Sequence, residues 1–267
     1  MLEAIADLYQ QFLSGLPEPA SMLIDFVVTL FPRLLEGAFV SVQLLLLSGV
    51  VGNLLALPVA LARVSRNPLL RVPSYLFILL MRGTPLLVQI FILYYGLGHI
   101  LGQIPVVRSS FLWRHLDAFW YAAAAFAINT AGYSGEILRG AILAVPHGEI
   151  DAARAFGMSK GLILRRVILP QAIRISLPTF SGETIALLKA TAIASTITVY
   201  ELLRVTNEAY AASYRFDECY ISAAIVYIAL SYVLTRAFYF TERQINKDRL
   251  PPSVLKAARP LEAPRAA

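Results

Sequence analysis

A single carboxylate stands out in a long apolar part of the sequence. Between Ile175 and Tyr200 the only ionisable residues are Glu183 and Lys189, and Thr184 follows the glutamate directly. A charge at the centre of a bilayer costs roughly 2.5–3.5 kcal/mol on insertion scales, so such a residue usually faces a cavity or a partner. We expect Glu183 and Thr184 to contact a solute, with the carboxylate favouring a cationic group. The alternative is an internal ion pair or a protonated, hydrogen-bonded Glu183.

A second polar interruption, Arg82-Gly83-Thr84-Pro85, lies inside the apolar run 72–98. Pro85 removes a backbone donor and disfavours helix at the residue before it. Irregular backbone at membrane depth is tolerated only beside protein or a cavity. We therefore expect Arg82 and Thr84 on a polar wall. Arg82 either contacts a substrate carboxylate, or it holds the kink or an inter-subunit pair.

A third polar group follows along the chain at Asn129 and Tyr133. Residues four apart share one face of a helix. These two side chains therefore either line a solute path together or form hydrogen bonds between helices.

The elements that position these residues are apolar helices. Hydrophobic residues make up 58% of the 267-residue chain, charged residues 15%, and the mean hydropathy is +0.65. Soluble domains average about 45–50% and 25%, and about 20 apolar residues cross a bilayer as a helix. We predict an all-α polytopic membrane protein with about five transmembrane helices. The predicted spans are residues 38–62, 72–98, 118–135, 175–200 and 219–240.

The basic residues orient these spans. Sixteen of the 23 lysines and arginines fall in three regions, 63–71, 139–174 and 236–265. Five spans place all three regions on one side, which the positive-inside rule makes cytoplasmic. The amino terminus is then outside and the carboxyl terminus inside.

The same pattern divides the chain into three parts. We expect an extracytoplasmic or interfacial segment over 1–35, a transmembrane domain over 36–245 and a disordered cytoplasmic tail over 246–267. Within the first part, the short segment 22–31 contains Asp25 and is interpreted as an interfacial amphipathic helix. A sixth span there is the alternative.

The segment 145–174 is too polar to span a membrane, yet its apolar residues recur at helical spacing. Asp151 lies near its start, where a negative charge suits the positive end of a helix dipole. Gly157 interrupts the pattern, and Pro170 is expected to close its second half. We predict two short helices joined by a glycine-centred turn, with a small-residue surface that another protein can approach.

This segment resembles the cytoplasmic motif of bacterial ABC importer permeases. The family pattern is Glu-Ala-Ala, three residues, Gly, nine residues, then Ile-x-Leu-Pro. The matching residues, in order, are Asp151, Ala152, Ala153, Gly157, Val167, Leu169 and Pro170. Aspartate replaces the family's glutamate and valine its isoleucine, and every spacing fits. The resemblance implies that these residues couple the chain to an ATPase.

Further motifs are similar to the polar amino-acid uptake branch of that family. They are Arg82-Gly83-Thr84-Pro85, Asn129-Thr130-Ala131 with Tyr133 and Glu136, and Leu188-Lys189-Ala190-Thr191. Within the branch, the chain is most similar to permeases for histidine, lysine, arginine and ornithine and to their opine-transporting relatives.

The resemblance implies a type I ABC importer permease fold, whose two short helices are coupling helices seated on the ATPase. The implied function is import of amino acids, basic ones or an opine, across the bacterial inner membrane by alternating access. The implied partners are a homologous permease forming a hetero-dimer, two ATPase subunits, a periplasmic solute-binding protein and membrane lipid. No nucleic-acid partner is implied.

The sequence gives no sign of enzymatic chemistry. It contains no Gly-Lys pair and therefore no phosphate-binding loop, so ATP and magnesium are expected on a separate ATPase subunit. Three scattered histidines and one cysteine do not form a metal site, and a membrane-embedded enzyme would lack a catalytic constellation. The main alternative is an ion-coupled secondary transporter or channel that uses Glu183 and Arg82. Such a protein would be expected to carry inverted repeats, and we find none.

Overall fold

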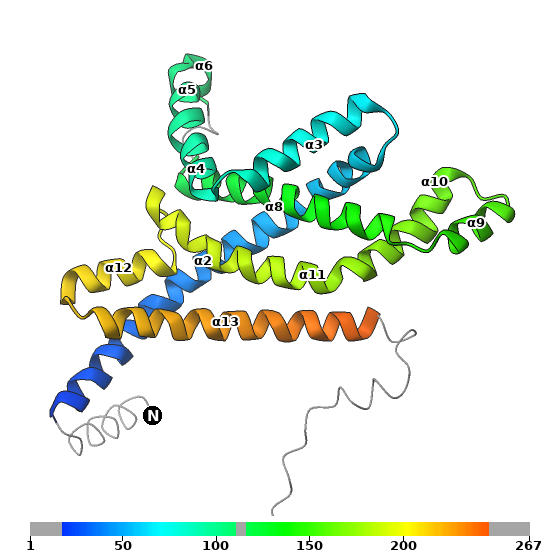
Figure 1. Ribbon diagram of the computed structural model, residues 1–267. Helices are drawn as coiled ribbons and strands as arrows, with labels where there is room; N and C mark the ends of the chain where they lie inside the picture. Colours follow the sequence, from blue (N-terminus) through cyan, green and yellow to red (C-terminus); the bar gives the residue numbers. More distant parts are fainter. Residues whose placement is uncertain (1–17, 111–115, 246–267) are drawn as a thin grey trace, which may run out of the picture.

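The computed structural model describes residues 18–110 and 116–245, and this part of the chain consists of helices joined by short turns. The first helix, α2 (Glu18–Val64), runs diagonally through the molecule (Figure 1). At about 1.5 Å per residue it is about 70 Å long, more than twice the ~30 Å hydrocarbon core of a bilayer. Pro32 and Pro58 lie within α2 without ending it.

Residues 22–31, which we interpreted as an interfacial amphipathic helix, are helical, and they continue without a break into the rest of α2. Leu30 and Leu34 are buried in an apolar cluster with Leu202 and Cys219. These contacts carry the helix past the expected domain boundary between residues 35 and 36 without a break. Packing against distant parts of the chain, which local composition does not reveal, therefore makes residues 22–31 part of α2.

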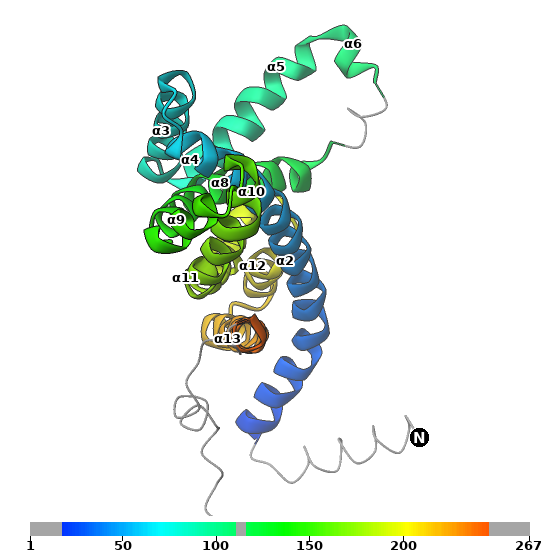
Figure 2. The ribbon, with the colours of Figure 1, turned by 90° about the vertical axis from the view of Figure 1, so that its right-hand side faces the viewer.

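The predicted span over 72–98 is broken. Helix α3 (Pro68–Gly83) ends at Thr84, whose backbone is extended, and a new helix begins after Pro85. The elements after the break are α4 (Leu86–Phe91), the π-helix η1 (Ile92–Leu97), α5 (Gly98–Gln103) and α6 (Pro105–Arg108). In Figures 1 and 2, α3 and the arm formed by α4 to α6 leave the break in different directions. The expected irregular backbone at Thr84 and Pro85 is present, and it redirects the chain.

Helix α8 (Ala118–Leu143) lies at the centre of the bundle, beside α2 (Figure 2). Half of its residues are buried. A Cβ on Gly52 of α2 would lie 2.6 Å from the Thr130 Cβ and 2.7 Å from the Ala127 carbonyl oxygen. Only glycine allows the two backbones to approach so closely, as is common where membrane helices cross.

The two predicted short helices after α8 are confirmed as α9 (His147–Ala155) and α10 (Lys160–Ile163). They form the tip at the right of Figure 1. The turn between them contains Gly157 at φ +74°, in the left-handed region that glycine adopts without steric cost. The sequence thus predicted both helices and the residue that reverses the chain.

The prediction that Pro170 closes the second short helix is wrong. The helix continues through the π-turn η2 (Leu164–Ile168) into α11 (Leu169–Ala190), and Pro170 lies in the first turn of α11. In a regular α-helix the proline ring clashes with the carbonyl four residues earlier. Here that position lies in η2, where hydrogen bonds close over one more residue. The wider turn therefore accommodates the proline without ending the helix.

The last third of the described chain folds back along the bundle. Helix α11 continues as the 3-10 helix η3 (Thr191–Ile197), followed by α12 (Leu202–Ser213) and α13 (Phe216–Ile245). The helical run Lys160–Ile197 and α12 meet at a bend of 53°. Helix α13 runs from the α12 end of the molecule toward the α9–α10 end (Figure 1).

By length and apolar composition, three described helices can cross a membrane, or four if the bent pair counts as one span. They are Phe26–Val64, Leu86–Gln103, Phe216–Ile245, and the pair Lys160–Ile197 with Leu202–Ser213. Four of the five predicted spans overlap these segments. The remaining predicted span, 118–135, lies in α8, which packs against α2, α3 and α11. Because α8 is surrounded largely by protein, it does not need a strongly apolar surface. The predicted tail, 246–267, lies outside the described residues.

Candidate functional site

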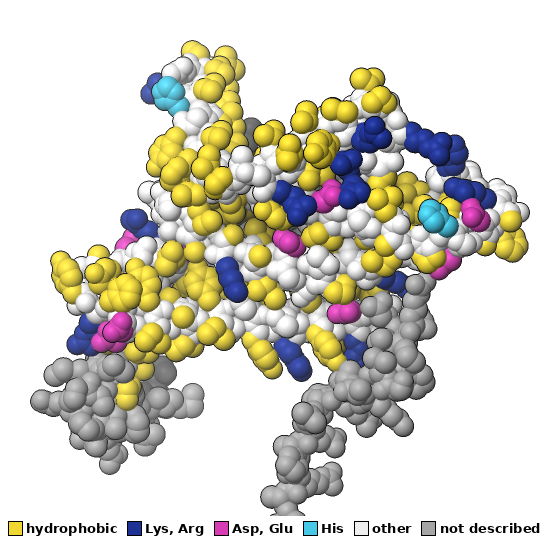
Figure 3. Space-filling model, viewed as in Figure 1, with side chains coloured by type: hydrophobic (Ala, Val, Ile, Leu, Met, Phe, Trp, Pro, Cys, Tyr) yellow, Lys and Arg dark blue, Asp and Glu magenta, His cyan; other side chains and the backbone are white. Residues whose placement is uncertain are grey.

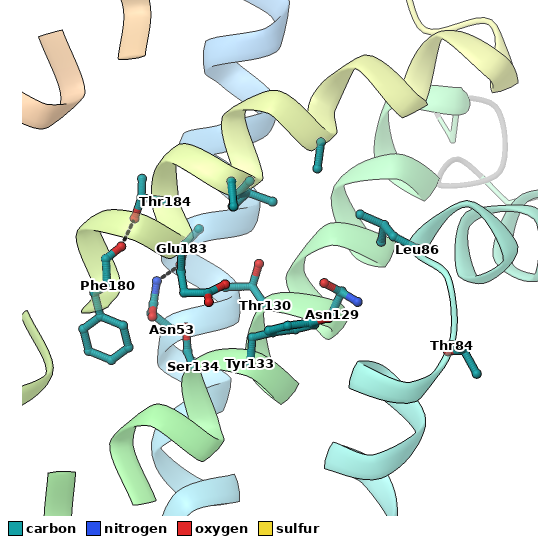
Figure 4. Close-up of a pocket in the computed structure, with 14 residues that line it drawn as sticks. Asn53, Thr84, Leu86, Asn129, Thr130, Tyr133, Ser134, Phe180, Glu183 and Thr184 are labelled. Carbon is teal, nitrogen blue, oxygen red and sulfur yellow. Dashed lines mark hydrogen bonds between the residues drawn. The ribbon is translucent and has the colours of Figure 1, made fainter. Parts of the chain in front are cut away.

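A cavity of about 230 Å³ lies between α2, α8, α11 and the break after α3 (Figure 4). This is smaller than the ~300–1,000 Å³ of pockets that enclose drug-sized ligands, and it suits a small solute. The lining residues are Gly49, Asn53, Thr84, Leu86, Asn129, Thr130, Tyr133, Ser134, Phe180, Glu183, Thr184, Ala186, Leu187 and Ala190. We call this the Glu183 cavity.

Five of the six predicted solute-contacting residues line the Glu183 cavity. They are Glu183, Thr184, Asn129, Tyr133 and Thr84. Glu183 is half-buried and has no ion-pair partner among the described residues. The Thr184 hydroxyl donates to the Phe180 carbonyl at 2.8 Å. The carboxylate is therefore the group in this wall that is left to act on a cation.

Asn129 both lines the solute cavity and forms hydrogen bonds between helices, the two roles that the sequence left open. It lines the cavity, and its amide donates to the Met81 carbonyl at 3.1 Å and to Gln89 Oε1 at 3.0 Å. Gln89 in turn donates to the Met81 carbonyl at 3.0 Å and to the Thr84 hydroxyl at 2.8 Å. The two amides thus bind polar groups exposed where α3 stops. They also fix the break against α8.

Arg82 does not line the Glu183 cavity but an adjoining one of about 410 Å³. The residues around this second cavity are Arg63, Tyr75, Ile78, Leu79, Arg82, Gly83, Tyr133 and Glu136. Tyr133 is common to both cavities. The Arg82 guanidinium lies over the Tyr133 ring, 5.3 Å from its centroid, and it interacts electrostatically with Glu183. The sixth predicted residue is therefore a neighbour of the site.

The predicted coupling residues fall into two groups. Asp151, Ala152, Ala153 and Gly157 lie on α9 and its turn, whereas Leu169 and Pro170 begin α11. Asp151 pairs with Arg154 at 2.7 Å on the exposed face. Ala153 is buried and Ala152 is exposed, so Ala153 packs against the protein whereas Ala152 is accessible.

The α9–α10 turn presents an aromatic side chain that the sequence did not single out as functional. Phe156 is 89% exposed, although phenylalanine is normally buried. It directly precedes Gly157, and the left-handed glycine turns the chain there. Its position in an apolar helical pattern suggested packing, and only the structure shows that it projects outward.

A hydrogen bond joins the α9–α10 tip to the bundle. Gln171, near the start of α11, donates from its side chain to the Glu149 carboxylate on α9. Ile150 packs against a buried cluster that includes Leu138 and Ala172. The tip is therefore fixed to α11, the helix that carries Glu183.

The chain matches the family model for the inner membrane component of binding-protein-dependent transport systems over residues 52–247. The chain belongs to this family. The match includes α8, the α9–α10 tip and α11, and it confirms the predicted resemblance to permeases of ABC importers. The permease function is thereby confirmed, and the alternative of a secondary transporter or channel is not favoured.

Curated relatives narrow the comparison. The chain is 44% identical to the octopine transport system permease protein OccM of Rhizobium radiobacter over 225 residues, 84% of this chain and 90% of that one. It is 40% identical to the histidine/lysine/arginine/ornithine transport system permease protein HisM of Escherichia coli K12 over 213 residues, 78% and 87% of the two chains. Both similarities extend over most of each protein.

The fold has solved counterparts. A chain in the crystal structure of an amino acid ABC transporter with histidines matches with a TM-score of 0.71 and 33% identity, over 81% of this chain and 96% of that one. The MetNI methionine ABC transporter matches with a TM-score of 0.65 at 19% identity, which supports the fold alone. The predicted all-α permease fold is confirmed.

Several cavity residues were not predicted as site residues. Asn53 comes from α2, Ser134 from α8 and Phe180 from α11, and Gln89 stands behind the cavity wall. Polarity alone would have flagged Asn53 and Gln89, since each is an isolated amide in an apolar run. No group of three or more His, Cys, Asp or Glu side chains in the described residues could hold a metal ion.

Proposed function

We propose that this permease carries basic amino acids or opines through the membrane and that Glu183 binds the cationic group of the solute. The single observation behind this proposal is a carboxylate that forms no ion pair with any described residue and lies in the wall of a small cavity lined by both polar and apolar side chains. A cation entering such a site replaces lost hydration with a charge-assisted hydrogen bond. The names of the relatives, which refer to octopine and to histidine, lysine, arginine and ornithine, agree with a cationic solute.

The α9–α10 tip is proposed as the docking site for a separate ATPase subunit. Support comes from its exposed Phe156, its small residues and its distance from α12 at the other end of the molecule (Figure 1). Of the three basic regions, 139–174 contains this tip, and 63–71 contains the loop between α2 and α3. This distribution supports a cytoplasmic tip, an external amino terminus and a cytoplasmic carboxyl terminus.

The complete importer is proposed to contain a second, homologous permease, two ATPase subunits and a periplasmic solute-binding protein. The few spans of this chain favour a path formed by two permeases. The arm from α4 to α5 supports the same interpretation, since it stands away from the bundle with large apolar side chains exposed, among them Ile92, Tyr95 and Ile100. ATP binding would close the ATPases and turn the permeases from inward-facing to outward-facing.

Uptake by the reconstituted complex tests this proposal. We expect proteoliposomes with both permeases, the ATPase and the solute-binding protein to accumulate radiolabelled L-arginine only when ATP is present. Omission of the ATPase is the control, and undiminished uptake without it would refute ATP-driven import. Uptake of acidic amino acids in preference to arginine or octopine would refute the proposed substrate class and leave the transport mechanism intact.

A further inference from the structure

The second cavity follows α3 from the break toward its beginning. Its lining includes Tyr75 and Gly83, which are about 12 Å apart along the helix axis. At one end it shares the Tyr133 wall with the Glu183 cavity, and at the other it reaches Arg63 in the last turn of α2. This second cavity, which we call the arginine vestibule, therefore lies between the Tyr133 wall of the solute site and the arginine-rich loop between α2 and α3.

The arginine vestibule has an excess of positive charge. Among the described residues that line it one is acidic, Glu136, which is paired with Arg139 at 2.6 Å and is also attracted by Arg63 and Arg82. Arg63 and Arg82 form no ion pair with any described residue. The buried Arg63 Nε also has no hydrogen-bond partner in the described part of the chain. Figure 3 shows arginine and lysine side chains gathered beside α3 on this face. Two guanidinium groups are thus left to attract an anion.

Aromatic rings orient both guanidinium groups. Arg63 lies 4.8 Å from the centroid of the Tyr75 ring, and Arg82 lies 5.3 Å from that of Tyr133. A guanidinium held over a ring by cation–π attraction keeps the N–H groups at its edge available. Those N–H groups match the two oxygens of a carboxylate. The arrangement suits a carboxylate better than it suits a simple point charge.

We propose that the arginine vestibule is the route by which the solute leaves the Glu183 cavity toward the cytoplasm, and that Arg82 and then Arg63 bind its carboxylate. This inference rests on the proposed import of a cationic amino acid or opine. Opposite charges on the two sides of Tyr133 would select solutes that carry both a cationic group and a free carboxylate. A decarboxylated amine would satisfy Glu183 but not the arginines.

An anionic lipid headgroup is the competing occupant, because Ile78 and Leu79 add apolar surface to the vestibule. The solute is favoured by the shared Tyr133 wall and by the electrostatic interaction of Arg82 with Glu183. A lipid site would not require either connection to the solute cavity.

Equilibrium binding to the nucleotide-free complex of both permeases with the ATPase tests the proposal. The probes are radiolabelled L-arginine and its decarboxylated analogue agmatine. We expect the wild-type complex to bind arginine roughly 10- to 100-fold more tightly than agmatine, the range for one charge-assisted hydrogen-bonded contact. Arg63→Gln and Arg82→Gln should each weaken arginine binding without weakening agmatine binding, so that the ratio of the two affinities falls. Arg63→Lys, which keeps the charge, should retain part of the preference for arginine over agmatine. This variant allows the test to be made even if Arg63→Gln does not fold.

Two controls separate the possible failures. Arg66→Gln removes a charge from the exposed loop beside the vestibule and should preserve the arginine preference. Glu183→Gln should weaken the binding of both arginine and agmatine, because both ligands carry a cationic group. If Arg63→Gln and Arg82→Gln both keep the wild-type preference for arginine over agmatine, the proposed role of the vestibule is wrong and the proposed substrate stands. If these variants also lose co-purified phosphatidylglycerol, the vestibule is a lipid site. Absence of binding of both arginine and octopine by the wild-type complex would refute the proposed substrate class and the vestibule with it.

Discussion

The Glu183 cavity and the α9–α10 tip are built in opposite ways. The cavity gathers side chains from α2, α8, α11 and the break before α4, which are far apart in the sequence. The tip is one continuous stretch, His147–Ala155 and Lys160–Ile163, with the turn between them. The cavity is recessed and polar, whereas the tip projects and carries an exposed phenylalanine.

This difference separates two kinds of requirement. A solute site depends on which charged and hydrogen-bonding groups face one another, so its changes should affect solutes unequally. A docking site depends on backbone shape and on an exposed apolar anchor, so its changes should affect every solute alike. Variants in the two regions can therefore be told apart by the pattern of uptake as well as by its amount.

The largest effect is expected at Gly157, where an arginine side chain would project from the docking surface and strain the left-handed backbone. Gly157→Arg should abolish co-purification of the ATPase and reduce uptake of all solutes to background, with normal membrane insertion. Gly161→Ala is the matched control, since Gly161 has ordinary helical geometry and open space around it. Wild-type ATPase yield with Gly157→Arg would contradict docking at this turn.

The next effect is expected at Glu183. Glu183→Gln should lower uptake of arginine and lysine roughly 10- to 100-fold, because a charged hydrogen-bond acceptor becomes neutral. Co-purification of the ATPase should not change. Glu208→Gln, which removes a carboxylate from an exposed pair with Arg204, serves as control. Equal uptake of cationic solutes by the Glu183 variant and the wild type would remove this residue from the site.

A smaller effect is expected at Phe156. Truncation of an exposed aromatic anchor often costs about 1–2 kcal/mol at an interface, so Phe156→Ala should weaken ATPase binding about tenfold. Titration of purified ATPase against the permease pair measures this affinity. Phe39→Ala, at an exposed position on α2, should leave the affinity unchanged. The interpretation fails if the two variants behave alike.

The smallest effect is expected at Asn129. Asn129→Ala removes two hydrogen bonds that join α8 to Met81 and Gln89, on either side of the break between α3 and α4. Interhelical hydrogen bonds in membranes contribute about 0.6–2 kcal/mol to stability. The free energy of unfolding should fall by that amount, seen as a lower melting temperature, and uptake should fall less than in the Glu183→Gln variant. Asn53→Ala is the control, because Asn53 lines the same cavity and, within the described part of the chain, its amide donates to the Gly49 carbonyl of its own helix α2. Equal melting temperatures for the two variants would contradict a structural role for Asn129.

Local features of the fold could be predicted from the sequence. Gly157 marked the turn at the tip, Thr84 and Pro85 marked the break, and Glu183 marked the cavity. In each case the physical cause acts within a few residues: a left-handed backbone, a missing N–H or a charge among apolar neighbours. Such signals survive without knowledge of the tertiary structure.

Features that depend on tertiary contacts were missed. Continuation of α2 through residues 22–31 depends on burial of Leu30 and Leu34 against α12 and α13. The place of Arg82 beside the cavity depends on how α3 packs on α8. Pro170 was misplaced because a π-turn, which composition does not announce, precedes it. Each miss reflects a contact or a helix register that periodicity does not contain.

Helix α11 connects the two regions directly. Its first turn holds α9 through Gln171 and Glu149, and Glu183 lies about 18 Å beyond Gln171 along the same helix. A displacement of the tip by a docked ATPase would thus move one wall of the cavity. Thermodynamic linkage makes the influence mutual: if nucleotide on the ATPase alters affinity at Glu183, then a solute at Glu183 must alter nucleotide affinity by the same factor. Solute binding in the cavity would in this way change the nucleotide affinity of the ATPase that drives transport.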